Sequence, residues 1–150
     1  MSADDLQRSL VSFVRSFGLL QPDRTPCGLE LHVSEAHALA EIGASTDLTQ
    51  QGLAGRLCLR KSTVSRLIGN LVDRGWVTRA PDRSDGRAFV LSLTDEGADV
   101  AERVRRSRTR RFEALLAAVP PKDRAGVVRA VQLLADAART SATANAGVAA

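Results

Sequence analysis

A chain of 150 residues, 44% of them hydrophobic, can form a core, because a domain of this size buries roughly 70% of its unfolded surface. It has no apolar run near the roughly 20 residues that span a bilayer, its first five residues carry two aspartates where a signal peptide is basic, and two cysteines are too few for a disulfide scaffold. Residues 54–111 hold 14 basic and seven acidic residues, a net +7, so the rest of a +4 chain carries −3. We therefore expect one cytoplasmic domain with no membrane partner, whose basic middle either binds a polyanion or is a solvated arginine-rich surface.

The first predicted elements are two helices joined by a loop. Apolar residues at 6, 10, 13, 14 and 17 form one stripe of a helix that ends near Gly18. Residues 21–28 contain two prolines and a glycine, which is typical of a loop. Ser34 can cap a second helix, which ends near Gly43.

The middle of the chain predicts two short helices across a tight turn. Thr49 precedes the first helix, whose apolar residues are 53, 54 and 57, and a turn follows at residues 58–60. Residues 61–74 form the second helix, with apolar residues at 64, 67, 68, 71 and 72 on one side, and Gly75 supplies a left-handed stop. This arrangement is typical of a helix-turn-helix unit.

After Gly75 the pattern favours a β-hairpin and then two more helices. Residues 76–79 and 88–93 are β-prone and flank a turn-rich segment at 81–87. Thr94 caps a helix that runs to about residue 119, a pair of prolines breaks it, and a last helix follows. Residues 141–150 lack periodicity and are expected to be a disordered tail. The predicted fold class is mainly α with a small β-hairpin (α+β).

The polar side of the helix at 61–74 carries side chains suited to DNA. Arginine can donate two hydrogen bonds to guanine, asparagine can pair with adenine, and a lysine in the first turn joins the free backbone N–H groups as a phosphate anchor. An ordinary amphipathic surface helix is the alternative interpretation. The candidate DNA-binding residues are Lys61, Ser62, Thr63, Ser65, Arg66 and Asn70.

The predicted hairpin ends in a basic tip. Arg83 and Arg87 are suited to a minor groove, whose negative potential attracts arginine, and Asp85 can hold the Arg87 guanidinium in place. The alternative is a solvated turn whose charges cancel. A basic tip that directly follows an amphipathic helix favours DNA.

Five segments together resemble the MarR family. They are residues 48–57 (LTQQGLAGRL), 61–68 (KSTVSRLI), 71–77 (LVDRGWV), 85–87 (DGR) and 93–97 (LTDEG). The sequence departs from the family pattern at Gly52, where an acidic residue is usual, and at Arg60, where a helix cap is usual. These departures put local helix stability in doubt, because Thr49 loses its capping partner.

The resemblance implies a winged helix-turn-helix at residues 34–93 within a single domain. Residues 1–25 and 95–140 would form a helical dimerisation region, so that a homodimer binds pseudo-palindromic double-stranded DNA. Residues 61–70 would supply the recognition helix and Arg87 the arginine of the wing, supported by Asp85. A small-molecule effector in a crevice between the dimerisation helices and the DNA-binding part would release the DNA.

Two other features of the sequence concern metal binding and redox chemistry. Cys27, Glu30, His32, Glu35 and His37 cluster in sequence, but the five-residue spacing of the histidines does not put two ligands on one helix face, so no metal site is predicted. Cys27 and Cys58 are possible redox thiols. Cys58 lies beside Arg56 and Arg60, although a small buried residue is expected in that turn.

The sequence therefore favours a sequence-specific transcriptional regulator with no cofactor. A repressor is favoured over an activator. The alternatives are a nucleoid-type DNA-binding protein with little sequence preference and a thiol- or metal-responsive regulator. An enzyme is disfavoured, because the chain has no glycine-rich phosphate loop, no nucleophile elbow and no suitably placed pair of carboxylates.

Overall fold

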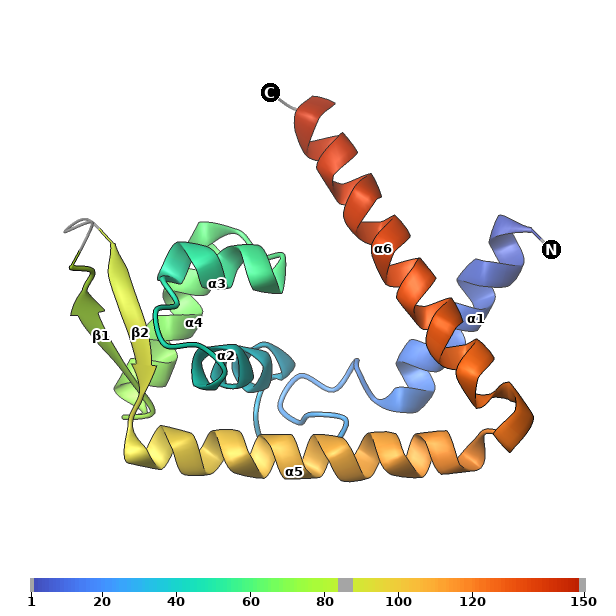
Figure 1. Cartoon of the computed structure of the whole chain (residues 1–150), viewed down its shortest axis with the longest axis horizontal. Coiled ribbons are helices and arrows are strands. Elements are labelled where there is room, and N and C mark those ends of the chain that lie inside the picture. Colours follow the sequence, from blue (N-terminus) through green and yellow to red (C-terminus); the bar gives the residue numbers. More distant parts are fainter. Residues whose placement is uncertain (1, 84–87, 149–150) are drawn as a thin grey trace. The chain divides into compact units, whose positions relative to one another are not determined.

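The computed structural model describes residues 2–83 and 88–148, and it is mainly helical with one two-stranded antiparallel sheet (Figure 1). The chain divides into two compact units between Arg111 and Phe112. None of the helices in the described part of the chain is both long enough and apolar enough to cross a membrane. The predicted fold class is confirmed.

The first unit begins with two helices, α1 (Ala3–Phe17) and α2 (Val33–Gly43). The backbone N–H of Ser2 donates to Asp5 Oδ2 at 2.8 Å and the N–H of Asp5 donates to Ser2 Oγ at 3.3 Å, which is a reciprocal cap. The predicted end near Gly18 is confirmed, since Gly18 has a φ of 89°. The predicted Ser34 cap is wrong.

His32, two residues earlier, is the N-cap of α2. Its backbone N–H donates to the Glu35 carboxylate at 3.1 Å, and its ring Nδ1 lies 2.6 Å from the carbonyl oxygen of Pro22. These contacts fix His32 at the start of the helix, so the usual preference for serine at a cap is overridden.

The helix-turn-helix unit consists of α3 (Gln50–Leu57) and α4 (Lys61–Asp73), as predicted. Thr49 caps α3 by accepting the Gly52 N–H at 3.1 Å. Cys58 ends α3 with a φ of 53° and is exposed, so the expectation that it is buried in the turn is wrong. A residue in the left-handed conformation at a helix end directs the chain away from the helix. Here the Cys58 side chain faces solvent, while Leu57 and Leu59 pack against the core.

The core of this unit is made by the apolar sides of α2, α3, α4 and the long helix α5 (Asp95–Ala118), together with the hairpin at residues 77–93. Leu39, Leu53, Ile68 and Leu71 are fully buried there, as is Leu91 of the hairpin. The five-member apolar pattern of the helix at 61–74 therefore identified its inward side correctly, with residue 72 only partly buried.

The hairpin consists of β1 (Val77–Pro81) and β2 (Phe89–Leu93), paired from Val77–Leu93 to Pro81–Phe89. It also pairs with the segment before α3, which the sequence did not predict. The N–H of Leu91 donates to the Leu48 carbonyl at 2.9 Å, and Thr49 forms a bridge with Val90. Strand β2 of the hairpin is thereby fixed to the start of α3.

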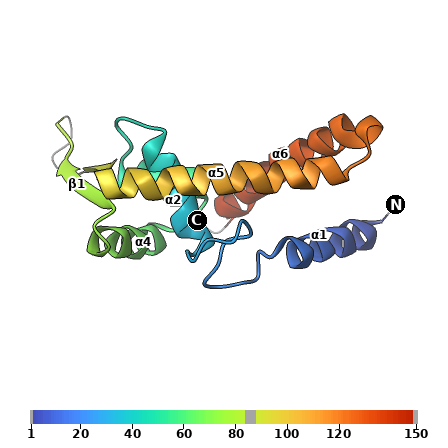
Figure 2. The ribbon, with the colours of Figure 1, turned by 90° about the horizontal axis from the view of Figure 1, so that it is seen from below.

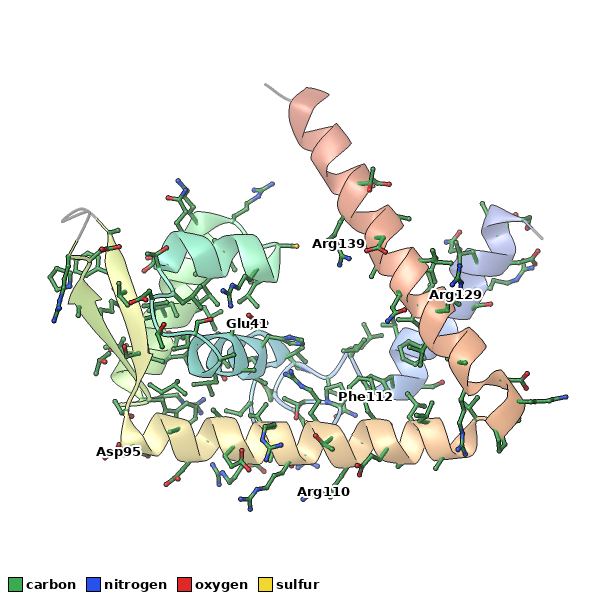
Figure 3. All side chains as sticks on the ribbon, viewed as in Figure 1. Glu41, Asp95, Arg110, Phe112, Arg129 and Arg139 are labelled. Atoms are coloured by element: carbon green, nitrogen blue, oxygen red, sulfur yellow. The ribbon has the colours of Figure 1, made fainter. Side chains whose placement is uncertain are left out.

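The long helix α5 (Asp95–Ala118) starts against the turn that precedes β1 (Figure 2). Thr94 is its cap, as predicted, and accepts the Gly97 N–H at 3.0 Å. The Thr94 hydroxyl donates to the Gly75 carbonyl at 2.7 Å, and its N–H donates to the Trp76 carbonyl at 3.0 Å. Asp95 lies in the first turn of α5 (Figure 3), where a negative charge is favourable.

The second unit contains the end of α5, a short 3-10 helix (Pro121–Asp123) and α6 (Arg124–Val148). The proline break is confirmed. Helix α6 continues to Val148, past residue 141, where the sequence pattern predicted the start of a tail. Alanine is the strongest helix former, and three alanines in these eight residues sustain a helix without an apolar stripe.

Candidate nucleic-acid interface

The interface is built on the outward side of α4. The apolar residues Val64, Leu67, Ile68 and Leu71 hold this helix against the core. Because an α-helix has 3.6 residues per turn, the polar residues between these apolar ones face outward. Lys61, Ser62, Ser65, Arg66 and Asn70 are exposed and Thr63 is half-buried, so the structure brings all six candidates of this helix onto one accessible side.

The start of α4 is suited to an anion. Arg60 is its N-cap and gives no side-chain cap hydrogen bond. The first N–H groups of a helix have no acceptor within the helix, and they carry the positive end of its dipole. Arg60 and Lys61 add two exposed cations there. The missing cap noted in the sequence therefore leaves donors available for a phosphate.

A groove beside this end of α4 joins three segments of the unit. Its lining includes Gln50 in the first turn of α3, Lys61 of α4, and Asp82 and Phe89 of the hairpin. The exposed Arg83 lies next to Asp82 at the end of the described part of the hairpin. Asp85 and Arg87, the predicted wing pair, fall outside the described residues.

The sequence analysis missed Arg79 as a member of this surface. Arg79 pairs with the buried Leu91, so its side chain lies on the side of the hairpin that faces α4. A Cβ added to Gly69 would lie 3.9 Å from the Arg79 guanidinium, which places that cation beside α4. The sequence alone could not identify Arg79, because the side of the hairpin on which it lies depends on how the two strands pair.

The arginine-rich stretch of α5 is largely paired within the chain. The Glu102 carboxylate accepts two hydrogen bonds from Arg105, both at 2.7 Å, and one from Arg106 at 2.6 Å. These bonds lower the pKa of Glu102 to about 2. Arg110 donates to Ser107, and the Arg111 guanidinium lies 5.3 Å from the Phe17 ring centre. Four arginines of the basic stretch that the sequence pointed to are therefore engaged in contacts within the chain.

The histidines and acids near the start of α2 make structural contacts within the first unit. No cluster of three or more His, Cys, Asp or Glu side chains with a metal-binding arrangement occurs among residues 2–83 and 88–148. His32 and Glu35 take part in the helix cap. Partial burial, and then the charge of Arg108, lower the pKa of His37 below its ordinary value of 6.5.

The two cysteines differ in their surroundings. The half-buried Cys27 has its Sγ 3.0 Å from the Thr25 hydroxyl, within a turn closed by Thr25 and Leu29. The exposed Cys58 directs its thiol toward the Gly55 carbonyl at 3.8 Å. Both are unpaired thiols. A redox role for either stays a prediction.

Comparison with known proteins identifies the family. A family model described as "MarR family" matches residues 29–88. The chain is 31% identical over 106 residues to an HTH-type transcriptional regulator of Mycobacterium bovis, Mb0904, and the match covers 71% of each chain. Its structure is similar to that of the transcriptional regulator PcaV from Streptomyces coelicolor in complex with its natural ligand, with a TM-score of 0.71, 26% identity, and coverage of 92% of this chain and 94% of PcaV.

The fold is also shared with a DNA-bound protein, the S. aureus MepR–DNA complex, at a TM-score of 0.73, 19% identity, and coverage of 91% of this chain and 98% of MepR. The resemblance found in the five sequence segments is thus confirmed by sequence and by structure. This chain belongs to the MarR family of winged helix-turn-helix transcriptional regulators.

Proposed function

We propose that the protein is a sequence-specific DNA-binding repressor that acts in the cytoplasm as a homodimer on a pseudo-palindromic operator. The observation that carries the proposal is the outward side of α4. It presents an arginine, an asparagine and three hydroxyl side chains beside an uncapped, basic helix start. Such a helix fits the major groove of B-form DNA, where these side chains distinguish base pairs.

The exposed apolar residues support the homodimer. Leu6, Leu10 and Phe13 are exposed on α1, and Val128 and Val131 are exposed on α6. Large side chains of this kind, repeated along one helix, favour burial against another protein surface. A second copy of the chain would cover them and would supply the second recognition helix that a palindrome requires.

A small-molecule effector is part of the proposal. It is supported by the similarity to PcaV, which was crystallised with its natural ligand. Such an effector would release the DNA by favouring a dimer whose two recognition helices no longer match successive major grooves.

The decisive experiment begins with selection of genomic fragments that bind the purified protein, followed by footprinting and titration at several salt concentrations. Arg66→Ala should reduce discrimination against a mismatched base pair by about 1–3 kcal/mol, whereas Arg87→Ala should weaken binding to all sequences. Arg103→Ala is the matched control, because Arg103 is an exposed arginine of α5 and lies outside the interface. Unchanged binding by both interface variants would refute these assignments.

The same titration separates a nucleoid-type binder from a specific regulator. A specific regulator binds its selected fragment thousands of times more tightly than bulk genomic DNA. Equal competition by the two DNAs would replace the proposed function with that of a general DNA-binding protein.

A further inference from the structure

A buried carboxylate connects the start of α2 with the end of the recognition helix. Glu35 is only 4% exposed. One of its oxygens, Oε2, accepts the backbone N–H of His32 at 3.1 Å and the Arg74 Nη1–H at 3.2 Å. Arg74 is the residue that ends α4, so a single oxygen atom holds two helix ends that are far apart in sequence.

The contact continues beyond Arg74 to the hairpin and α5. The Arg74 guanidinium lies over the Trp76 ring, 4.3 Å from its centre. The Trp76 indole N–H donates to Glu96 Oε1 in the first turn of α5 at 3.4 Å. On the other side, the His32 ring is bonded to Pro22 in the loop between α1 and α2. The row His32–Glu35–Arg74–Trp76 thus extends from that loop to the exit of the recognition helix.

The ion pair of the buried Glu35 with the partly exposed Arg74 gives a weak stability argument, because the desolvation of the carboxylate offsets much of the attraction. An apolar residue at position 35 would pack in the same place without that penalty. The pair has a stricter geometric requirement than apolar packing, since the carboxylate must meet both the His32 N–H and the guanidinium. This requirement defines one position of the end of α4 relative to α2.

We propose that Glu35 is a positioning residue of the DNA-reading surface, which acts through Arg74 to fix the end of α4 and the start of the hairpin. The inference deepens the proposed function, because it rests on α4 being the helix that reads DNA. It also gives the α1–α2 loop a direct connection to that helix. Movement of Pro22 or His32 would be transmitted to Arg74 without any change in the DNA-contacting side chains.

Trp76 provides a reporter that requires no DNA, since it is the only tryptophan of the chain. Glu35→Gln keeps the size of the side chain and an acceptor for the His32 N–H, but it removes the charge that holds Arg74. We expect acrylamide to quench Trp76 fluorescence more strongly in this variant, because Arg74 no longer covers the ring. Glu41→Gln is the matched control on the same helix, since Glu41 forms an exposed ion pair with Arg56 at 3.0 Å.

The DNA measurement uses the fragment that the wild-type protein selects. Glu35→Gln and Arg74→Gln should each weaken binding about tenfold, as expected if the correctly positioned form falls to about one-tenth of the population. The double variant should lose no more than either single variant, because both substitutions break the same contact. Arg74 is 43% exposed in its side chain, so its replacement leaves the core intact and the comparison is made on folded protein.

Independent losses that multiply in the double variant would overturn the inference, as would unchanged quenching of Trp76 in Glu35→Gln. If the wild-type protein selects no fragment, the proposed function fails, and the quenching experiment alone then decides whether Glu35 positions Arg74. If the fragment is selected and Glu35→Gln binds it as the wild type does, the function stands and the inference fails.

Discussion

Replacement of Gly97 tests how closely α5 is joined to the hairpin. A Cβ at this position would lie 1.9 Å from the Trp76 carbonyl oxygen and 2.8 Å from its carbonyl carbon. Both atoms are backbone and cannot rotate away. To bring even the shorter contact to 3.0 Å, the start of α5 must retreat by about 1.1 Å, the difference between 3.0 Å and the 1.9 Å contact.

That retreat acts on the hydrogen bonds made by Thr94. The Thr94 N–H bond to Trp76 is 3.0 Å long and the Thr94 hydroxyl bond to Gly75 is 2.7 Å long, so both would be stretched beyond useful range. Overpacking costs about 1–3 kcal/mol and each lost hydrogen bond about 1 kcal/mol, whereas alanine gains at most about 1 kcal/mol of helix propensity. The expected net loss for Gly97→Ala is about 2–4 kcal/mol.

Urea or thermal unfolding of the full chain at one fixed protein concentration measures this loss, and the midpoint temperature should fall by roughly 10 °C. Gly55→Ala in α3 is the control, because a Cβ there meets nothing within 4 Å and the substitution should be neutral or stabilising by up to about 1 kcal/mol. A Gly97→Ala variant as stable as the wild type would refute the reasoning.

Three further outcomes are expected. Thr49→Ala should lower the unfolding free energy in urea by about 1 kcal/mol, because the Gly52 N–H loses its acceptor. The lowered pKa of Glu102 means that its ion pairs stabilise the fold fully above its ordinary value of 4.5 and progressively less as the pH falls toward about 2, so Glu102→Gln should be less stable than the wild type at pH 7 and the difference should shrink as the pH falls from 4.5 toward 2. NMR titration of His37 should give a midpoint below 6.5, and this midpoint should rise in Arg108→Ala. Because His37 binds the proton more readily in the unfolded chain, the free energy of unfolding should fall as the pH is lowered from 6.5 to that midpoint.

Local chemistry made much of this fold predictable. Gly75 has a φ of 73°, and the sequence indicated a left-handed helix stop there because glycine adopts that conformation without strain. The apolar spacing of α4 identified its inward side, and by exclusion the outward side that carries Arg66 and Asn70. These features depend on residues within one or two helical turns of each other, which is the range at which sequence patterns are informative.

Features set by distant residues could not be predicted in this way. Ser34 is a better N-cap than His32 by preference alone, but His32 is bonded to Pro22 and Glu35, and those contacts require the folded loop. In the sequence Glu35 stands near two histidines and a cysteine, as a metal ligand would, whereas in the structure its partner Arg74 lies 39 residues along the chain. The placement of Arg79 beside Gly69 likewise depends on the hairpin register. A single sequence carries no direct record of such long-range pairs.

The attachment of the hairpin through strand β2 has a consequence for how members of this family can diverge. The contacts that join it to the start of α3 involve Leu48, Thr49, Val90 and Leu91, and on the hairpin they lie within β2, outside the connection between the two strands. Substitutions or grafts between Pro81 and Phe89 would therefore leave these anchoring bonds untouched. The segment between the strands could then change between relatives, and with it the contacts made to a DNA groove, while the fold of the domain stays the same.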